Sequence, residues 1–247
     1  MLKGNEIEIM RKNAKIHQKV FDAIREMVKD GTTATEVDQL CGEIAKKHNV
    51  LCGFRGVYGF PNNICISVND CVVHGRALPD IVFRDGDLVT FDFGIRDKQV
   101  GVNTDAAISM IVGGDDKNPE GAKMIEANKK ALYAGIAQAK AGNRVGDISH
   151  AVETEVKKAG YYVVKELTGH AIGKKLHEKP YIPNYGTAGT GAKLKEGMTL
   201  CIEPILGQKT ARVVDDGDWE IYIEDGSLGC QVEHTILITK GEPEIII

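Results

Sequence analysis

The stretch "DGDLVTFDFG", Asp85 to Gly94, holds one acidic residue, Asp92, inside an apolar run rich in β-branched and aromatic residues. That composition predicts a strand. A second stretch, "EGMTLCIEPI" (196–205), has the same order of residue types, and its Glu203 follows Asp92 by 111 positions. The pair indicates that the chain contains two similar halves.

Further matches keep the same spacing. "KDGTTATEV" (29–37) corresponds to "KAGNRVGDI" (140–148), again 111 positions later. A third match sets Ala45-Lys46-Lys47 against Val156-Lys157-Lys158. One match would be chance, but three at a single offset favour an internal duplication. A single repeat near half the length is unlike the 20–50-residue periods of solenoids. We therefore expect one domain, 1–247, made of two halves, about 1–113 and 114–247.

Each half places helical patterns before strand-like runs. Apolar spacing of three and four predicts helices at 5–29, 34–48, 119–140 and 145–159. Runs of β-branched and aromatic residues predict strands at 63–68, 88–95, 106–113, 161–167, 198–206, 219–225 and 233–240. Helices that precede a run of strands predict an α+β fold, in which an antiparallel or mixed sheet carries the helices on one face.

Composition excludes several classes of function. The net charge of −4 lacks the basic excess that a general nucleic-acid-binding protein needs. No run approaches ~18 uninterrupted apolar residues, so we expect no membrane span. The N-terminus lacks the apolar region of a secretory signal. The six cysteines form no CxxC pair and are typical of reduced thiols in the cytoplasm.

Four carboxylates interrupt apolar strand segments: Asp92, Asp105, Glu203 and Glu233. Burial of an isolated charge is unfavourable, although one such residue alone would be interpreted as structural. At ~4 Å and an effective dielectric of ~20, each like-charge pair costs about 4 kcal/mol. Two divalent cations would balance four carboxylates, so the pattern favours a dinuclear metal site.

The segment "TGHAIGKKLHEKPYIP" (168–183) contains His170 and His177. Gly173 and Pro180 argue against a helix there, and no HExxH pattern is present. One neutral imidazole added to four carboxylates suits Mn, Fe, Co or Zn better than Mg or Ca alone. Bridging carboxylates hold two such ions ~3.5–4 Å apart, the separation used in two-metal hydrolysis.

The motifs "DFG", "TDAAISMIVG", "TGHAIG", "MTLCIEPIL" and "QVEHTILIT", in this order, resemble those of the type I methionine aminopeptidases, which have the pita-bread fold. The resemblance covers essentially the whole chain. It implies a curved antiparallel or mixed sheet with pseudo-two-fold symmetry and helices on its outer face. It also implies two divalent ions (Co, Mn, Fe or Zn) on a ligand set of Asp92, Asp105, His170, Glu203 and Glu233.

The resemblance further implies hydrolysis of the first peptide bond after an N-terminal methionine, by a hydroxide that bridges the metals. Glu203 would carry the proton to the leaving amine. His177 would donate to the scissile carbonyl, and His74 of "CVVHG" would lie beside the scissile nitrogen. The methionine pocket would be lined by Phe60, Cys65 and Trp219, with Leu176 a weaker candidate; each is also compatible with plain core packing.

Three features depart from the family pattern: Ala171 stands where Gly is usual, Val57 where an aromatic residue is usual, and the spacing from Asp92 to Asp105 is two residues longer. An added pair of residues preserves strand parity, so both acids can still share one face. Of the other histidines, His17, His48 and His150 are expected at the surface. His234 should point to the sheet face opposite Glu233.

Two alternatives stay open. One is an Xaa-Pro peptidase of the same fold, although those proteins usually carry an additional N-terminal domain. The other is a non-catalytic binding protein with the pita-bread fold, which would typically have lost metal ligands. We expect a monomeric enzyme that acts on peptides and nascent N-termini and has no specific nucleic-acid or membrane partner. Ribosome association suits such substrates, but no basic patch indicates it.

Overall fold

The computed structural model describes residues 1–215 and 217–247. Its four α-helices are α1 (Gly4–Met27), α2 (Ala34–Lys47), α3 (Pro119–Gln138) and α4 (Val145–Lys158). The short 3-10 helices are η1 (Val57–Gly59) and η2 (Asp115–Lys117). The four predicted helices are therefore confirmed to within two residues at each end. In the described part of the chain, no helix has the length and apolar character that a membrane span requires.

The strands pair antiparallel wherever they form ladders. In the first half they are β1 (Val50–Cys52), β2 (Cys65–Val68), β3 (Cys71–Val73), β4 (Leu88–Asp97) and β5 (Asn103–Ile111). In the second half they are β6 (Tyr162–Val163), β7 (Thr168–Ala171), β8 (Glu178–Pro183), β9 (Thr199–Ile202), β10 (Ile205–Gly207), β11 (Val213–Asp215), β12 (Ile221–Ile223), β13 (Gly229–Gln231), β14 (His234–Leu237) and β15 (Glu244–Ile245).

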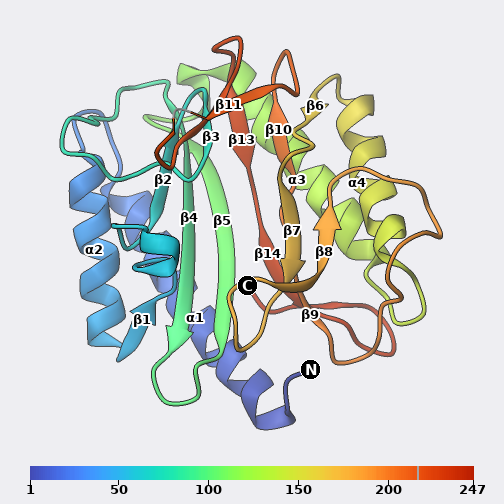
Figure 1. Ribbon diagram of the computed structural model, residues 1–247. Coiled ribbons are helices and arrows are strands. Elements are labelled where there is room, and N and C mark those ends of the chain that lie inside the picture. The colour runs from blue at the N-terminus through green and yellow to red at the C-terminus, as the bar shows by residue number, and fades with distance from the viewer. Residues whose placement is uncertain (216) are drawn as a thin grey trace.

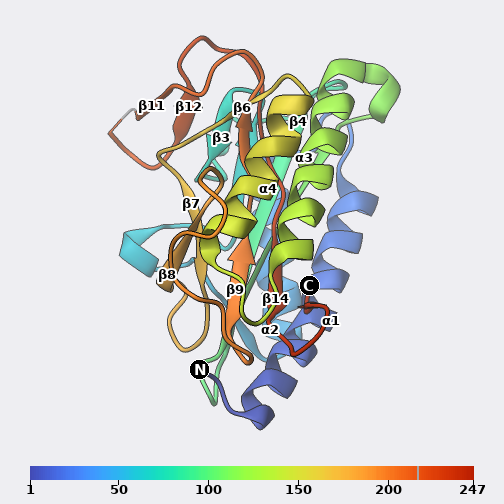
Figure 2. The same cartoon turned by 90° about the vertical axis from the view of Figure 1, so that its right-hand side faces the viewer.

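The helices form a layer on one side of the strands. Figure 1 shows α1 and α2 with β1, β4 and β5 on one side of the molecule, and α3 and α4 with β6 to β10 on the other. The side view in Figure 2 places the helices on one face and the β11–β12 hairpin on the opposite face. The halves meet where Ala107 of β5 bridges Glu233, just before β14. The predicted α+β fold with helices on the outer face is confirmed.

Backbone contacts repeat at the spacing of 111 residues. The bridge between Thr33 and Val82 has a counterpart between Arg144 and Lys193. The hydrogen bond from the Gly31 amide to the Phe83 carbonyl (2.9 Å) has a counterpart from Gly142 to Leu194 (3.0 Å). The first turns of α2 and α4 are also capped alike, because Glu36 and Asp147 accept from the amides of Thr33 and Arg144. These matched contacts agree with the two-half division, which stays a prediction.

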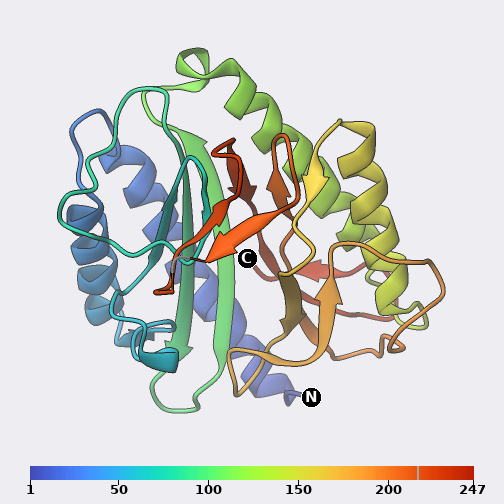
Figure 3. The ribbon, with the colours of Figure 1, turned by 45° about the horizontal axis from the view of Figure 1, so that its top comes forward.

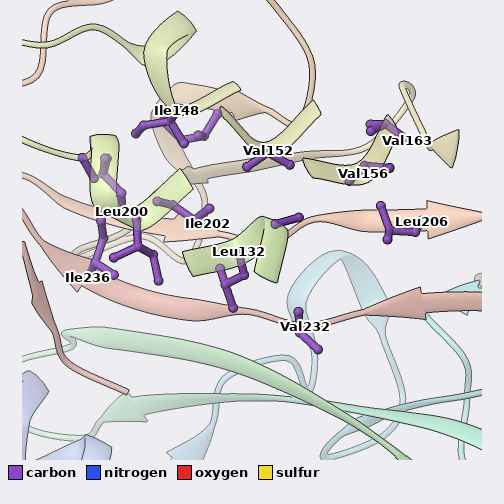
Figure 4. Packing of buried hydrophobic residues seen from close by; sticks show 14 of the residues in the cluster. Leu132, Ile148, Val152, Val156, Val163, Leu200, Ile202, Leu206, Val232 and Ile236 are labelled. Carbon is purple, nitrogen blue, oxygen red and sulfur yellow. The ribbon is translucent and has the colours of Figure 1, made fainter. Parts of the chain in front are cut away.

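A hydrophobic core fills the space between each helix pair and the strands. In the second half, residues of α3 and α4 such as Leu132, Ile148 and Val152 face Ile202 of β9, as Figure 4 shows. Gly135 makes this packing possible, since a Cβ there would lie 2.7 Å from Cγ2 of Val152. The core thus holds the strands that carry the candidate site against a rigid helical support.

Several predicted strands are shorter or broken. The run 198–206 divides into β9 and β10 at Glu203-Pro204, because proline has no amide to donate to a ladder. Of 161–167 only Tyr162–Val163 is a strand, and of 219–225 only Ile221–Ile223. The segment 168–183, where a helix was excluded, contains β7 and β8.

The prediction for His17 was wrong. This residue has 0% exposure, and its Nε2 lies 3.0 Å from Oγ1 of Thr104 between α1 and β5. The reason is helical period: His17 lies on the same stripe as the buried residues Met10, Val20 and Ile24. By contrast, His150 is exposed and His48 is half-buried. His234 points toward the helices as expected and contacts the ring of Tyr133 of α3.

Candidate metal centre

The first two carboxylates come from the longest hairpin of the sheet. In the β4–β5 register, Asp92 pairs with Ala107 and Gly94 pairs with Asp105. The two acids are therefore diagonal neighbours on one face, as strand parity predicts. The longer hairpin preserves the geometry on which the predicted site depends.

The remaining predicted ligands come from the second half. His170 of β7 pairs with Cys201 of β9, and Glu203 follows β9 directly. Nε2 of His170 lies 3.4 Å from Oε1 of Glu203. Glu233, through its bridge to Ala107, lies across the junction between the halves. The structure thus brings together all five residues for which a ligand role was predicted.

These side chains leave buried oxygen atoms without partners among the described residues, namely Oδ1 of Asp92, Oδ1 of Asp105 and Oε1 of Glu233. Ligand atoms of Asp105, His170, Cys201 and Glu233 all lie within 4.8 Å of one another. Buried carboxylate oxygens that lack hydrogen bonds are unfavourable unless a cation binds them. The donor set therefore fits a divalent cation.

Electrostatics support the same conclusion. Burial raises the pKa of Asp92 to about 7. Burial, followed by the charge of neighbouring carboxylates, raises the pKa of Asp105, Glu203 and Glu233 well above their ordinary values. Burial also lowers the pKa of His170 to about 3, so its imidazole is neutral and able to coordinate. Such a group of acids is ionised at neutral pH only when positive charge compensates it.

Three residues that support the ligands were missed by the sequence reasoning. Nε2 of Gln231 donates to Oε2 of Glu203 (3.1 Å) and to Oδ2 of Asp92 (3.4 Å). The hydroxyl of Thr235 accepts from the Asp105 amide and donates to its carbonyl. Sγ of Cys201 lies 3.5 Å from Oγ1 of Thr235 and within 4.8 Å of ligand atoms of Asp105, His170 and Glu233. The available signal was period two, because each lies two positions from a predicted ligand and so faces the same side of its strand.

A pocket of about 320 Å³ opens beside the carboxylates. Every residue predicted for the pocket lines it, namely Phe60, Cys65, His74, Leu176, His177 and Trp219. The edge of the Trp219 ring packs on Phe60 with ring centroids 5.3 Å apart. Val57, where an aromatic residue was expected, also contributes to the wall, as do the unpredicted Phe54, Tyr58 and Leu167. The four predicted carboxylates and a set of apolar and aromatic side chains thus line one pocket.

The two pocket histidines come from different segments of the chain. The ring of His177 meets that of His170 edge-on at 4.5 Å, and the ring of Tyr58 lies parallel to His177 at 6.3 Å. His74 has a left-handed backbone with φ of 59°, a conformation that persists in a non-glycine residue only where its surroundings impose it. Partial loss of water lowers the pKa of both His74 and His177. Neutral imidazoles are therefore favoured beside the acids.

Comparison with known proteins identifies the family. The sequence model of metallopeptidase family M24 matches residues 8–240. The chain belongs to metallopeptidase family M24. Within it, a methionine aminopeptidase from Clostridium perfringens is 39% identical over 244 residues, which cover 98% of this chain and 96% of that protein. The crystal structure of a methionine aminopeptidase from Thermotoga maritima has a TM-score of 0.95 and 39% identity, and the match covers 99% of this chain and 97% of that one. The resemblance and the pita-bread fold are confirmed.

The M24 fold also includes proline-directed enzymes. A prolidase from Pyrococcus horikoshii has a TM-score of 0.77 at 24% identity, and this chain covers 62% of its length. That likeness shows the shared fold alone.

Proposed function

We propose that this chain is a metal-dependent methionine aminopeptidase, which removes the N-terminal methionine from peptides and proteins by hydrolysis of the first peptide bond. The observation that carries the proposal is the position of the five potential ligands. They line the same pocket as a set of apolar and aromatic side chains, and three of them have unpartnered buried oxygens. A pocket that ends at a cationic centre suits a substrate with an apolar first side chain and a free amine.

The centre would hold two divalent ions, because two such charges balance four carboxylates. Asp92, Asp105 and Glu233 supply unpartnered oxygens, and His170 and Glu203 complete the set. Oxygen-rich ligands with one imidazole suit Co, Mn, Fe or Zn. Bound there, the cations would polarise the scissile carbonyl and lower the pKa of the attacking water.

The protein's own residues would position the substrate and move protons. Glu203, with Oε2 held by Gln231, would take a proton from the attacking water and pass it to the leaving amine. His177 would donate to the scissile carbonyl oxygen as negative charge develops there. His74 would lie beside the scissile nitrogen. Phe60, Cys65 and Trp219 would contact the methionine side chain, whose thioether packs well on aromatic rings.

An assay on Met-Ala-Ser and Ala-Pro-Ala tests the activity. The peptides are incubated with the protein, with and without a chelator, and Mn, Fe, Co or Zn is then added back. We expect release of free methionine that chelation abolishes and a cation restores. Proline-dependent cleavage would instead favour the Xaa-Pro alternative, and two inert peptides would favour the non-catalytic one.

The role of Glu203 is tested by Glu203→Gln. Loss of the proton carrier should lower turnover at least about 100-fold while the protein still folds. Glu196→Gln is the matched control, since Glu196 is exposed and lies seven positions earlier in the same half. Metal content is measured in both variants, because Glu203 is also a proposed ligand. Near-native turnover by metal-loaded Glu203→Gln would contradict the assignment.

We further propose a single catalytic domain, 1–247, with halves at about 1–113 and 114–247. The contacts repeated at 111 residues support the division. We also propose a cytoplasmic monomer that acts on nascent N-termini, including those at the ribosome, without a specific nucleic-acid or membrane partner. All six cysteines are free thiols, which supports a reducing compartment.

A further inference from the structure

An arginine beside the pocket joins two segments that are far apart in sequence. Arg76 lies two residues after His74, in the loop that follows β3. Its Nε donates to Oε1 of Glu220 (2.7 Å), its backbone amide donates to the same oxygen (3.1 Å), and its Nη2 donates to Oδ2 of Asp218 (2.8 Å). We call this group, Arg76 with Asp218 and Glu220, the Arg76 latch.

The latch differs from an ordinary surface ion pair. Glu220 is 4% exposed, and its other oxygen, Oε2, is buried without a hydrogen-bond partner among the described residues. Its charge therefore depends on Arg76, since a buried carboxylate that loses its partner is strongly unfavourable. The same hairpin also carries an exposed pair, Arg212 and Glu224, with side-chain exposures of 77% and 39%. Exposed ion pairs of that kind contribute little to the free energy of unfolding.

The residues on either side of the latch line the pocket. Asp218 and Glu220 flank Trp219, whose ring packs on Phe60. In the loop after β3, Arg76 lies two positions after His74, whose backbone is left-handed. Figure 3 shows the hairpin of β11 and β12 crossing in front of the sheet, away from the helices that support the core.

The β11–β12 hairpin and the β3 segment are also joined by a hydrogen bond from the Ile223 amide to the Asp70 carbonyl (2.8 Å) and by a hydrophobic cluster that includes Val73, Ile221 and Ile223. The ladder between β12 and β3 consists of two residue pairs, Ile221 with Val73 and Tyr222 with Cys71, with a register shift between them. A ladder this short and irregular does not by itself fix the angle of the hairpin. Where the ladder ends, the Arg76 guanidinium adds directional bonds, from Nε to Glu220 and from Nη2 to Asp218. Arg suits this role because its donors form a rigid planar fork.

We propose that Arg76 is a positioning residue, which sets the His74 imidazole and the Trp219 indole relative to each other across the pocket. The effect on catalysis rests on the proposed function, whereas the effect on geometry does not. Displacement of either wall should misplace the substrate, and a displacement of about 1 Å in an active site can lower a rate by about 100-fold.

The test uses Arg76→Ala, with Arg212→Ala as the matched control, since Arg212 forms the exposed ion pair of the β11–β12 hairpin. Trp219 is the only tryptophan in the chain, so its emission reports this wall alone. In the Arg76 variant we expect a red shift of emission and a fall in kcat/KM for Met-Ala-Ser of at least about tenfold, with native circular dichroism and metal content. Arg212→Ala should match the wild type in all four measurements. Arg76→Lys should recover only part of the loss, since an ammonium cannot reproduce the fork.

Emission is read without substrate, so it tests the positioning even if the wild type cleaves no peptide. A folded Arg76→Ala variant with wild-type emission and kinetics would overturn the proposal. If that variant does not fold, Glu220→Gln replaces it in the test, because glutamine keeps the shape of the glutamate side chain and one acceptor oxygen. A folded Glu220→Gln with shifted emission and reduced kcat/KM supports the latch. Unchanged values, or a second failure to fold, would assign the group to stability and refute the positioning role.

Discussion

Gln231 offers a sharp test of how the sheet supports the metal centre. Its amide nitrogen donates to Glu203 at 3.1 Å and to Asp92 at 3.4 Å, so one side chain contacts two of the proposed ligands. Gln231→Met keeps the length of the side chain and removes both bonds. The amide oxygen of Gln231 is buried without a partner among the described residues, so its loss should not itself destabilise the fold.

The expected magnitude follows from the two bonds. One has an ordinary length and the other is at the long limit, and hydrogen bonds to charged groups contribute about 1.5–3 kcal/mol. That range corresponds to a loss of metal affinity of roughly 10-fold to 150-fold. It agrees with the roughly 10-fold to 100-fold effects seen when residues that orient metal ligands are replaced. Burial raises the pKa of Asp92 and Glu203, so the metal-free protein holds these groups largely protonated and the bonds join neutral groups. The free energy of unfolding of the metal-free protein should therefore fall by only about 0.5–1.5 kcal/mol.

Metal affinity is measured by calorimetric titration of Mn and Co into the wild type and the variant, and stability by urea unfolding in chelator. Gln208→Met is the matched control, because Gln208 donates to Glu120 outside the site. Metal affinity within threefold of the wild type in Gln231→Met would refute the orienting role. Equal losses in both variants would show that the effect is not local.

Two further predictions concern stability. Gly135→Ala should destabilise the protein by about 1–3 kcal/mol in urea unfolding, because the added Cβ would lie 2.7 Å from Val152. The control Gly4→Ala should be near neutral, since nothing lies within 4 Å of its Cβ position. Equal effects of the two substitutions would contradict the packing argument. Burial lowers the pKa of His17 to about 3, so the folded state keeps it neutral while the unfolded state takes up a proton below about pH 6.5. The free energy of unfolding should therefore fall as the pH falls from 7 to 5, by about 2 kcal/mol more in the wild type than in His17→Gln. Parallel pH profiles of the two proteins would show that the pKa of His17 does not differ between the folded and unfolded states.

Much of the site followed from local pattern. Asp92 and Asp105 were placed on one face by parity along a hairpin, and the register confirms that arrangement. Carboxylates inside apolar strands are chemically conspicuous, because burial without compensation is unfavourable. Helix ends were predictable because capping contacts join residues that are close in sequence. Thr33 and Glu36, three positions apart, cap α2 in this way.

Other features escaped prediction because they depend on distant partners. The break at Pro204 divides a run that reads as one strand, and the two-residue β6 exists only through pairing with β10. Gln231 and Thr235 are ordinary strand residues until β13 and β14 come beside β5. The burial of His17 follows from its position on the apolar stripe of α1, whereas the polarity of histidine alone predicts exposure.

Residue identity and period alone determined the helices, the duplicated order of elements and the set of acids that require a cation, since each depends on contacts within a few positions or on the high free energy of burying charge. Only the tertiary structure decided which atoms face one another across the pocket. Arg76 and Glu220 are 144 positions apart, and no local pattern encodes their meeting. Such pairs form because chain folding brings two halves around one centre, where each buried charge is stable only beside its partner.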